Sequence, residues 1–113
     1  MITEDYVSFE TAKLLNEKGF DWNCESKKFY PEPDYDQESP DGVYAPTLQT
    51  AMKWLREVHY LWIDIDPLTS YKWTWSIWFM NDLNSKMGES SQVVSTYKEA
   101  CESAIKYCLE NLI

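Results

Sequence analysis

The chain has 113 residues and a formal net charge of −9, with 10 Lys and Arg residues against 19 Asp and Glu residues. Affinity for nucleic acid comes mainly from Lys and Arg that contact phosphates, so this charge argues against a nucleic-acid partner. The same charge repels an anionic membrane surface, and no apolar run approaches the roughly 18 residues that span a bilayer. Acidic residues near the N-terminus stand where a secretion signal has basic and apolar ones, which predicts a cytoplasmic protein.

The composition predicts a single α+β domain over residues 1–113. Hydrophobic residues make up 44% of the chain and aromatic residues 16%, which is enough for a packed core. The three cysteines form no CxxC pair, so a disulfide framework is not expected. Cys101 and Cys108 are seven residues apart on the apolar face of an expected helix and are predicted to be small core residues.

The N-terminal part predicts one helix, one weak strand and a loop. The helix is expected near residues 8–18, with Ser8 as its N-cap and Gly19 placed to end it in a left-handed conformation. A weak strand is expected at 27–30. The segment 31–46 contains four of the five prolines, five acidic residues and no basic one, and is predicted to be an irregular acidic surface loop.

A second helix is predicted near residues 47–58, because apolar residues repeat there at intervals of three and four. Its expected buried stripe consists of Leu48, Ala51, Met52, Leu55 and Val58. The polar side chains expected on the opposite side are Gln49, Lys53, Arg56 and Glu57.

The hydrophobic period then changes to two, which predicts a β-hairpin. Its strands are expected at 60–66 and 71–80, joined by a turn at 67–70. The inner face would carry apolar side chains from both strands: Leu61, Ile63, Ile65, Trp73, Trp75, Ile77 and Phe79. In this register Lys72 lies opposite or diagonal to Asp64 and Asp66, so the charges agree with the pairing.

The C-terminal part predicts a third helix. Residues 81–91 are polar and rich in turn formers, and 92–95 could add a short edge strand. Thr96 and Glu99 have the spacing of a capping box, and the apolar residues that follow predict a helix near 96–111. The expected order is helix, weak strand, helix, strand, strand, possible strand, helix. This order predicts a two-layer α+β fold in which three helices pack on an antiparallel sheet of two to four strands.

His59 is the only histidine, and it lies at the end of the second expected helix, where a positive side chain is favourable. A structural role is therefore the preferred interpretation. The alternative is an enzyme or small-ligand binder in which His59 acts with Cys24 or Asp64. The sequence displays no catalytic constellation and no glycine-rich phosphate loop, so neither an enzyme nor a cofactor is expected.

Five acidic residues cluster in the predicted loop: Glu32, Asp34, Asp36, Glu38 and Asp41. Their spacing matches a calcium-binding loop only in part, because Ser39 and Ala45 stand where such a loop needs Gly and Glu. A solvated acidic loop is the preferred interpretation, and no metal is expected. These acids would set the specificity and encounter rate of binding to a partner.

The outer face of the predicted hairpin carries Tyr60, Trp62 and Trp78, with the two tryptophans within diagonal reach. If helices cover only the inner face, these side chains form an exposed patch of the kind that marks interaction surfaces. If the first helix or the acidic loop folds over them, they belong to the core. The first hypothesis is a noncatalytic module that binds a protein partner or itself through the patch. Single-stranded nucleic-acid binding by stacking is a further alternative, although the sequence lacks the basic groove of such proteins.

Three runs carry a resemblance to a known group of proteins: YVSFETAKLLNEKGF (6–20), YAPTLQTAMKWLREVHYLWIDI (44–65) and TYKEACESAIKYCLENLI (96–113). Together they resemble a family of short uncharacterised proteins from gut bacterial genomes and their phages and prophages. The resemblance implies a small cytoplasmic protein of mobile-element type, and it implies no activity, cofactor or catalytic residue. It adds one version of the interaction hypothesis, in which the acidic protein occupies the basic, nucleic-acid-binding surface of a host protein.

Overall fold

The computed structural model describes residues 5–22, 27–31, 42–90 and 93–113 and shows a small α+β fold. Its helices are α1 (Phe9–Glu17), α2 (Leu48–His59) and α3 (Tyr97–Tyr107), followed by the π-helical turn η1 (Cys108–Leu112). Its strands are β1 (Lys27–Pro31), β2 (Gly42–Pro46), β3 (Leu61–Thr69), β4 (Lys72–Phe79) and β5 (Asp82–Glu89). The three predicted helices and the predicted hairpin are confirmed. Within the described residues, no helix has both the length and the apolar character needed to cross a membrane.

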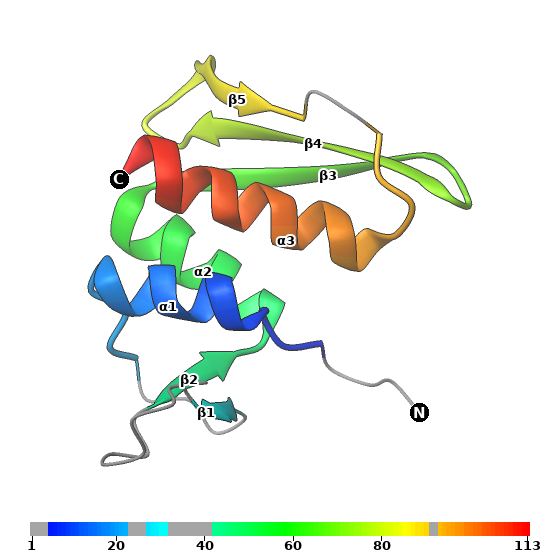
Figure 1. Ribbon diagram of the computed structural model, residues 1–113. Helices are drawn as coiled ribbons and strands as arrows, with labels where there is room; N and C mark the ends of the chain where they lie inside the picture. Colours follow the sequence, from blue (N-terminus) through cyan, green and yellow to red (C-terminus); the bar gives the residue numbers. More distant parts are fainter. Residues whose placement is uncertain (1–4, 23–26, 32–41, 91–92) are drawn as a thin grey trace.

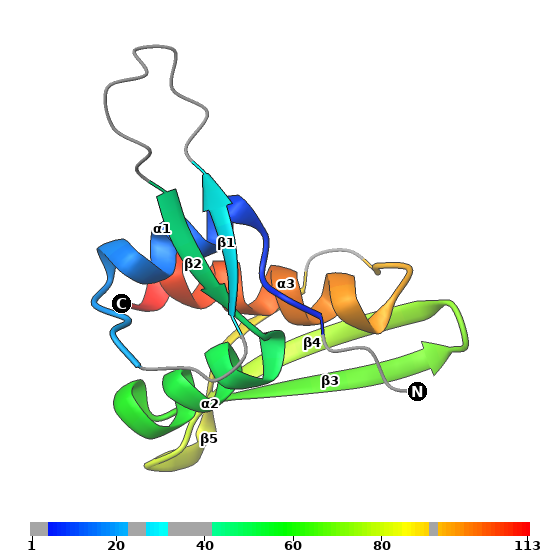
Figure 2. The same ribbon diagram turned by 90° about the horizontal axis from the view of Figure 1, so that it is seen from below.

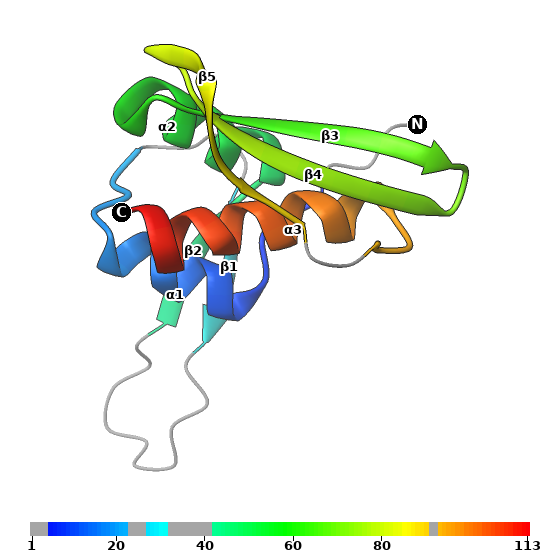
Figure 3. The ribbon, with the colours of Figure 1, turned by 90° about the horizontal axis from the view of Figure 1, so that it is seen from above.

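The strands form two separate antiparallel sheets. One contains β3, β4 and β5 in this order, and the other contains β1 and β2. In Figure 1, α2 and α3 lie on one side of the three-stranded sheet, and α1 lies beyond them, next to β2. Figure 2 shows the two-stranded sheet beside α1, away from the three-stranded sheet. The view from above looks onto the opposite side of the three-stranded sheet, which none of these three helices covers (Figure 3).

The helix ends follow the predicted capping chemistry. The Ser8 hydroxyl accepts a hydrogen bond from the Thr11 N–H at 3.3 Å, and the Thr96 hydroxyl accepts one from the Glu99 N–H at 3.0 Å. Gly19 ends α1 with a φ of 95°. The N–H of the residue after it, Phe20, donates to the Leu15 carbonyl at 2.9 Å, which is the bond of a Schellman motif.

The register of β3 and β4 confirms the predicted faces. The inner-face pairs are Leu61 with Phe79, Ile63 with Ile77 and Ile65 with Trp75. The turn differs from the prediction, because β3 continues through Pro67 to Thr69 and only residues 70–71 connect the strands. Pro67 is tolerated since β3 is an edge strand with a bulge after this residue. Lys72 consequently pairs with Thr69. The residues directly opposite Asp64 and Asp66 are Ser76 and Thr74.

The third strand of the main sheet comes from the segment predicted to be turn-rich. β5 lacks an apolar alternation in its sequence, and its pairing with β4 shifts register on both sides of Trp78. β5 therefore depends on backbone pairing with β4 and not on a hydrophobic face of its own. The edge strand considered at 92–95 is represented by one isolated bridge between Val94 and Trp73, and residues 91–92 lie outside the described part.

The predicted loop at 31–46 is too long at both ends. β1 extends to Pro31, and β2 occupies Gly42–Pro46, so the prediction of irregular structure is wrong for these residues. Their pairing places Tyr44 opposite Phe29. β2 also packs against α1, and this tertiary contact stabilises the strand. The strand was not predicted because the prolines of the segment indicate irregular structure.

The core fills the space between the three-stranded sheet and the helices. Its most completely buried large side chains include Leu15, Leu55, Ile77, Ile105 and Leu109. Cys101 and Cys108 are also buried, as predicted. Burial raises the pKa of the Cys108 thiol to about 12. Cys108 therefore acts as a small apolar side chain and not as a nucleophile.

The buried face of α2 differs from the predicted stripe. Trp54 is 2% exposed, whereas Val58 is 44% exposed. The cause is tertiary: the ring of Phe20, in the segment after α1, packs edge-on against Trp54 with 5.4 Å between ring centroids. Trp54 therefore contributes to the core from a helix position that the sequence pattern did not select.

Gly88 of β5 lies directly against Tyr107 of α3. A Cβ atom at residue 88 would stand 2.9 Å from Cζ of Tyr107 and closer still to Cε1. We expect Gly88→Ala to lower the free energy of unfolding by about 1–3 kcal/mol, the usual cost of overpacking. Urea denaturation measures this change. In a Tyr107→Ala background the same substitution should cost much less, and an equal cost in both backgrounds would contradict the steric explanation.

Candidate functional site

The sheet face away from the helices carries the tryptophan side chains singled out in the sequence. Trp62 of β3 and Trp78 of β4 are directly opposite each other, closer than the predicted diagonal. Trp62 is 41% exposed and Tyr60 is 50% exposed, while Trp78 is partly buried. Tyr60, which was expected on the same strand face, instead precedes β3 as the residue that ends α2. We call Trp62 and Trp78 the outer aromatic face. Because no helix of the described chain covers it (Figure 3), the alternative that α1 buries these side chains is wrong.

Tyr60 connects α2 to β3 in a left-handed backbone conformation, with a φ of 59°. Its N–H donates to the Leu55 carbonyl, and its own carbonyl accepts from the Met80 N–H at 2.8 Å. A left-handed φ costs a residue with a Cβ atom roughly 1–2 kcal/mol, and glycine is the usual residue at such a helix end. Tyr60 therefore ends α2 at a conformational cost and leaves its side chain half-exposed.

Each tryptophan of the outer aromatic face lies under a cation. The Arg56 guanidinium is 5.6 Å from the centroid of the Trp62 ring, and the Lys86 ammonium is 5.3 Å from that of Trp78. The Trp78 indole N–H also donates to the Ser76 hydroxyl at 3.1 Å. These contacts orient both indoles.

An open groove of about 330 Å³ runs over this surface. It is lined by Trp62, Asp64, Trp78 and Met80, and we call it the outer groove. Two indole rings and a thioether form most of its wall, and Asp64 is its acidic group. Such a groove can receive an apolar side chain from a partner.

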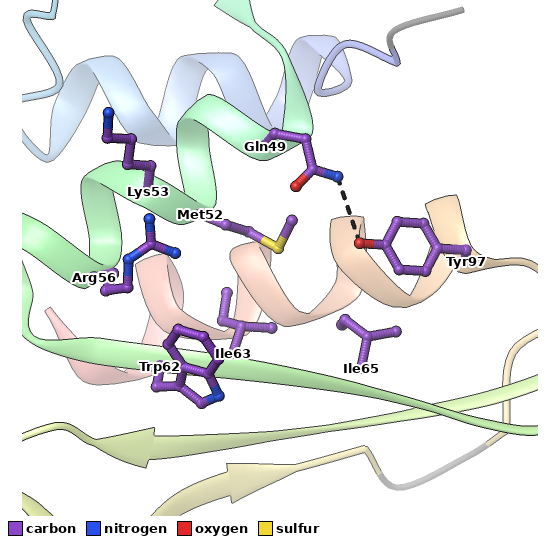
Figure 4. A pocket seen from close by; sticks show the side chains of 8 residues that line it. All are labelled: Gln49, Met52, Lys53, Arg56, Trp62, Ile63, Ile65 and Tyr97. Carbon is purple, nitrogen blue, oxygen red and sulfur yellow. Dashed lines mark hydrogen bonds between the residues drawn. The ribbon is translucent and has the colours of Figure 1, made fainter. Parts of the chain in front are cut away.

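A second groove, which no hydrophobic pattern in the sequence indicates, lies between α2 and β3 (Figure 4). Its volume is about 420 Å³, and we call it the α2–β3 groove. Its lining residues are Gln49, Met52, Lys53, Arg56, Trp62, Ile63, Ile65 and Tyr97. At one end Gln49 donates a hydrogen bond to the Tyr97 hydroxyl at 3.4 Å, and Arg56 and Trp62 stand at the other end (Figure 4). The groove thus combines an apolar middle with polar and cationic ends.

The structure places His59 and Asp64, considered above as a catalytic pair, in different surroundings. The His59 ring packs edge-on against Trp54 with 4.7 Å between centroids, whereas Asp64 lines the outer groove. The His59 Nε2 atom is buried and has no hydrogen-bond partner among the described residues. Burial lowers the pKa of His59, which favours the neutral ring against Trp54. Cys24 lies outside the described residues.

Lowering the pH should destabilise the protein in part through His59. Because its folded-state pKa lies below the ordinary value of 6.5, the unfolded state binds more protons between the two values, and stability falls as the pH drops through that window. This part of the dependence should be absent in a His59→Gln variant. The measurement is the thermal unfolding midpoint of both proteins from about pH 7.5 to about pH 5. Parallel curves for the two proteins would contradict this assignment.

The acids of the predicted loop lie outside the described residues; they are Glu32, Asp34, Asp36, Glu38 and Asp41. Within the described ranges, no group of three His, Cys, Asp or Glu side chains is placed to hold a metal ion. Comparison with known proteins found no family model, no curated protein and no solved structure that matches the chain. The two grooves and the outer aromatic face are therefore the basis for inferring its function.

Proposed function

We propose that this protein is a noncatalytic interaction module that binds a partner protein through the outer aromatic face. The observation that carries the proposal is the facing pair of Trp62 and Trp78 on a sheet surface that no described helix covers. Clustered exposed aromatic side chains are typical of docking surfaces, and tryptophan is enriched among residues that dominate binding energy.

The arrangement of the two indoles favours binding because it is already ordered. Arg56 and Lys86 lie over the rings, and Ser76 accepts the hydrogen bond of Trp78. A side chain whose orientation is set before binding loses less conformational entropy when the complex forms. The outer groove between the rings would receive an apolar anchor from the partner.

The charge of the chain favours a partner with a basic surface. The net charge is −9, and residues 32–41 contribute five acids without a base. Long-range attraction of this kind speeds encounter with an oppositely charged protein. One version of the proposal is competition for the basic, nucleic-acid-binding surface of a host protein. Because salt screens such attraction, the complex should weaken as ionic strength rises.

The test is a pull-down from bacterial lysate with the wild-type chain and a Trp62→Ala/Trp78→Ala variant as baits. We expect a protein that the wild type captures and the variant loses, because each hot-spot truncation costs about 2 kcal/mol or more. Tyr71→Ala is the matched control, since Tyr71 is a 68% exposed aromatic residue in the turn at the other end of the hairpin. Circular dichroism checks that all three baits are folded.

Two further arms separate the alternatives. Repeating the capture at low and high salt measures how much the acidic charge contributes. Nuclease treatment distinguishes a direct protein complex from nucleic-acid binding by stacking on the same rings, because captured material that disappears with nuclease points to the latter. Equal capture by the wild type and the double variant would overturn the proposal.

A further inference from the structure

We propose that the α2–β3 groove is a second docking site, which takes an extended acidic segment of a partner protein as an additional strand along β3. This site goes beyond the outer aromatic face, and only Trp62 lines both grooves. Three features carry the proposal: the free edge of β3, the apolar middle of the groove, and the two cations that α2 contributes to it.

β3 is an edge strand of the sheet, and part of its backbone faces away from β4. In an antiparallel pair, residues alternate between those bonded to the partner strand and those directed away from it. The Trp75 carbonyl accepts from the Ser90 N–H at 2.9 Å, on the side of β4 away from β3. Ile65 lies opposite Trp75 and therefore directs its N–H and C=O toward the free edge, as does Ile63 two residues earlier. No described residue outside the sheet is bonded to these groups.

The groove beside this edge suits alternate side chains of an added strand. Met52 of α2 faces Ile63 and Ile65 of β3 across it (Figure 4). Because successive side chains of a strand point to opposite faces, every second side chain of the added segment would enter this apolar middle. Backbone bonds to the β3 edge would supply affinity, and the groove would select the side chains.

The cations of the groove indicate an acidic segment. Lys53 and Arg56 both line it, and neither forms an ion pair with any residue that the structure describes. A guanidinium binds a carboxylate through two parallel hydrogen bonds, which makes an acidic side chain the matching group for Arg56. The net charge of −9 opposes an acidic ligand at long range. At physiological salt, charges more than about 8 Å apart are largely screened. The cations that contact the ligand therefore determine whether an acidic segment is attracted to the groove.

A second copy of this chain fits the edge less well. Two β3 strands paired with each other would bring Asp64 and Asp66 of both copies onto one short ribbon, and like charges across a strand pair are destabilising. Pro67 has no N–H to donate, so it ends the usable edge. The usable edge therefore lies at Ile63 and Ile65, and the site accepts a short extended segment.

The test begins with random displayed peptides of about nine residues, longer than a typical strand of about five or six. They are selected on the immobilised full chain, and the selected peptides are synthesised with blocked ends. We expect a set that carries apolar residues at alternate positions and an acidic residue at one end for Arg56, and that binds a Lys53→Glu/Arg56→Glu variant about tenfold more weakly or worse. Backbone N-methylation should abolish binding at alternate positions of the peptide and be tolerated between them, because only every second N–H would face β3.

Trp78→Ala is the control that separates this site from the outer aromatic face. Trp78 lines the outer groove and not the α2–β3 groove, so the peptides should bind this variant within about twofold of the wild type. A selection without binders, peptides that are insensitive to the charge reversal, or N-methylation effects without alternation would each overturn the proposal. Loss of peptide binding in the Trp78→Ala variant would also overturn it, since the peptides would then occupy the outer aromatic face.

Discussion

Replacing Trp54 by alanine should lower the free energy of unfolding by about 3–5 kcal/mol, the range for a large aromatic side chain removed from a core. Trp54 is 2% exposed, and its ring meets Phe20 at 5.4 Å and His59 at 4.7 Å between centroids. The substitution removes both ring contacts and leaves a cavity at the junction of α2 with the segment after α1. Since small domains have only about 5–15 kcal/mol of stability, this one change would remove a large part of it.

Urea denaturation at neutral pH measures the cost, provided that the slope of the transition stays constant. Val58→Ala is the matched control, because Val58 is on the same helix but 44% exposed, and its truncation should change stability by about 0.5 kcal/mol or less. A second signal comes from His59, whose pKa should rise toward its ordinary value when the ring beside it is lost. A cost below about 1 kcal/mol for Trp54→Ala would contradict the burial of this ring.

The hairpin was predictable from the sequence because its signal is local. The period-two alternation assigns the inner and outer faces, and the register of Ile63 with Ile77 matches that assignment. The helix ends were predictable for a similar reason. Ser8, Gly19 and Thr96 act on backbone groups only a few residues away, so their effect does not depend on the rest of the fold.

The elements that the sequence did not reveal are those formed by distant contacts. β5 has no apolar alternation, and it forms because β4 offers an edge to pair with. The burial of Trp54 depends on Phe20, which is separated from it by the whole β1–β2 segment. Local patterns carry no information about such partners, so these features require the tertiary structure.

The candidate sites show the same difference between features with a local sequence signal and features formed by tertiary contacts. Tyr60, Trp62 and Trp78 could be named from the sequence, but their exposure depends on which side of the sheet the helices occupy. The α2–β3 groove was missed, because Lys53 and Arg56 read as an ordinary solvent-facing side of a helix. Its signal was the presence of two cations on one face in a chain with only 10 Lys and Arg residues. The two cations line a groove because the side chains of β3 lie beside this face of α2 in the folded chain.

Replacing Ile77 by alanine should lower the free energy of unfolding by about 2–5 kcal/mol, although the adjacent Trp78 is much the larger side chain. Ile77 is fully buried in the central strand β4 and lies opposite Ile63 on the face that the helices cover. Its truncation leaves a cavity between the sheet and the helices that the close-packed neighbours fill only in part. Thermal and urea unfolding of Ile77→Ala and Trp78→Ala, measured side by side, give the comparison.

For Trp78→Ala we expect a smaller loss of about 1 kcal/mol, the scale of one cross-strand side-chain pair, here with Trp62. The two substitutions thus separate the two faces of one strand. Ile77→Ala should reduce stability strongly and leave partner binding of the remaining folded protein unchanged. Trp78→Ala should reduce stability only slightly and weaken partner binding. If Trp78→Ala costs as much stability as Ile77→Ala, the outer aromatic face belongs to the core and is not free for a partner. The outcome therefore tests, without any knowledge of the partner, whether this surface is available for binding.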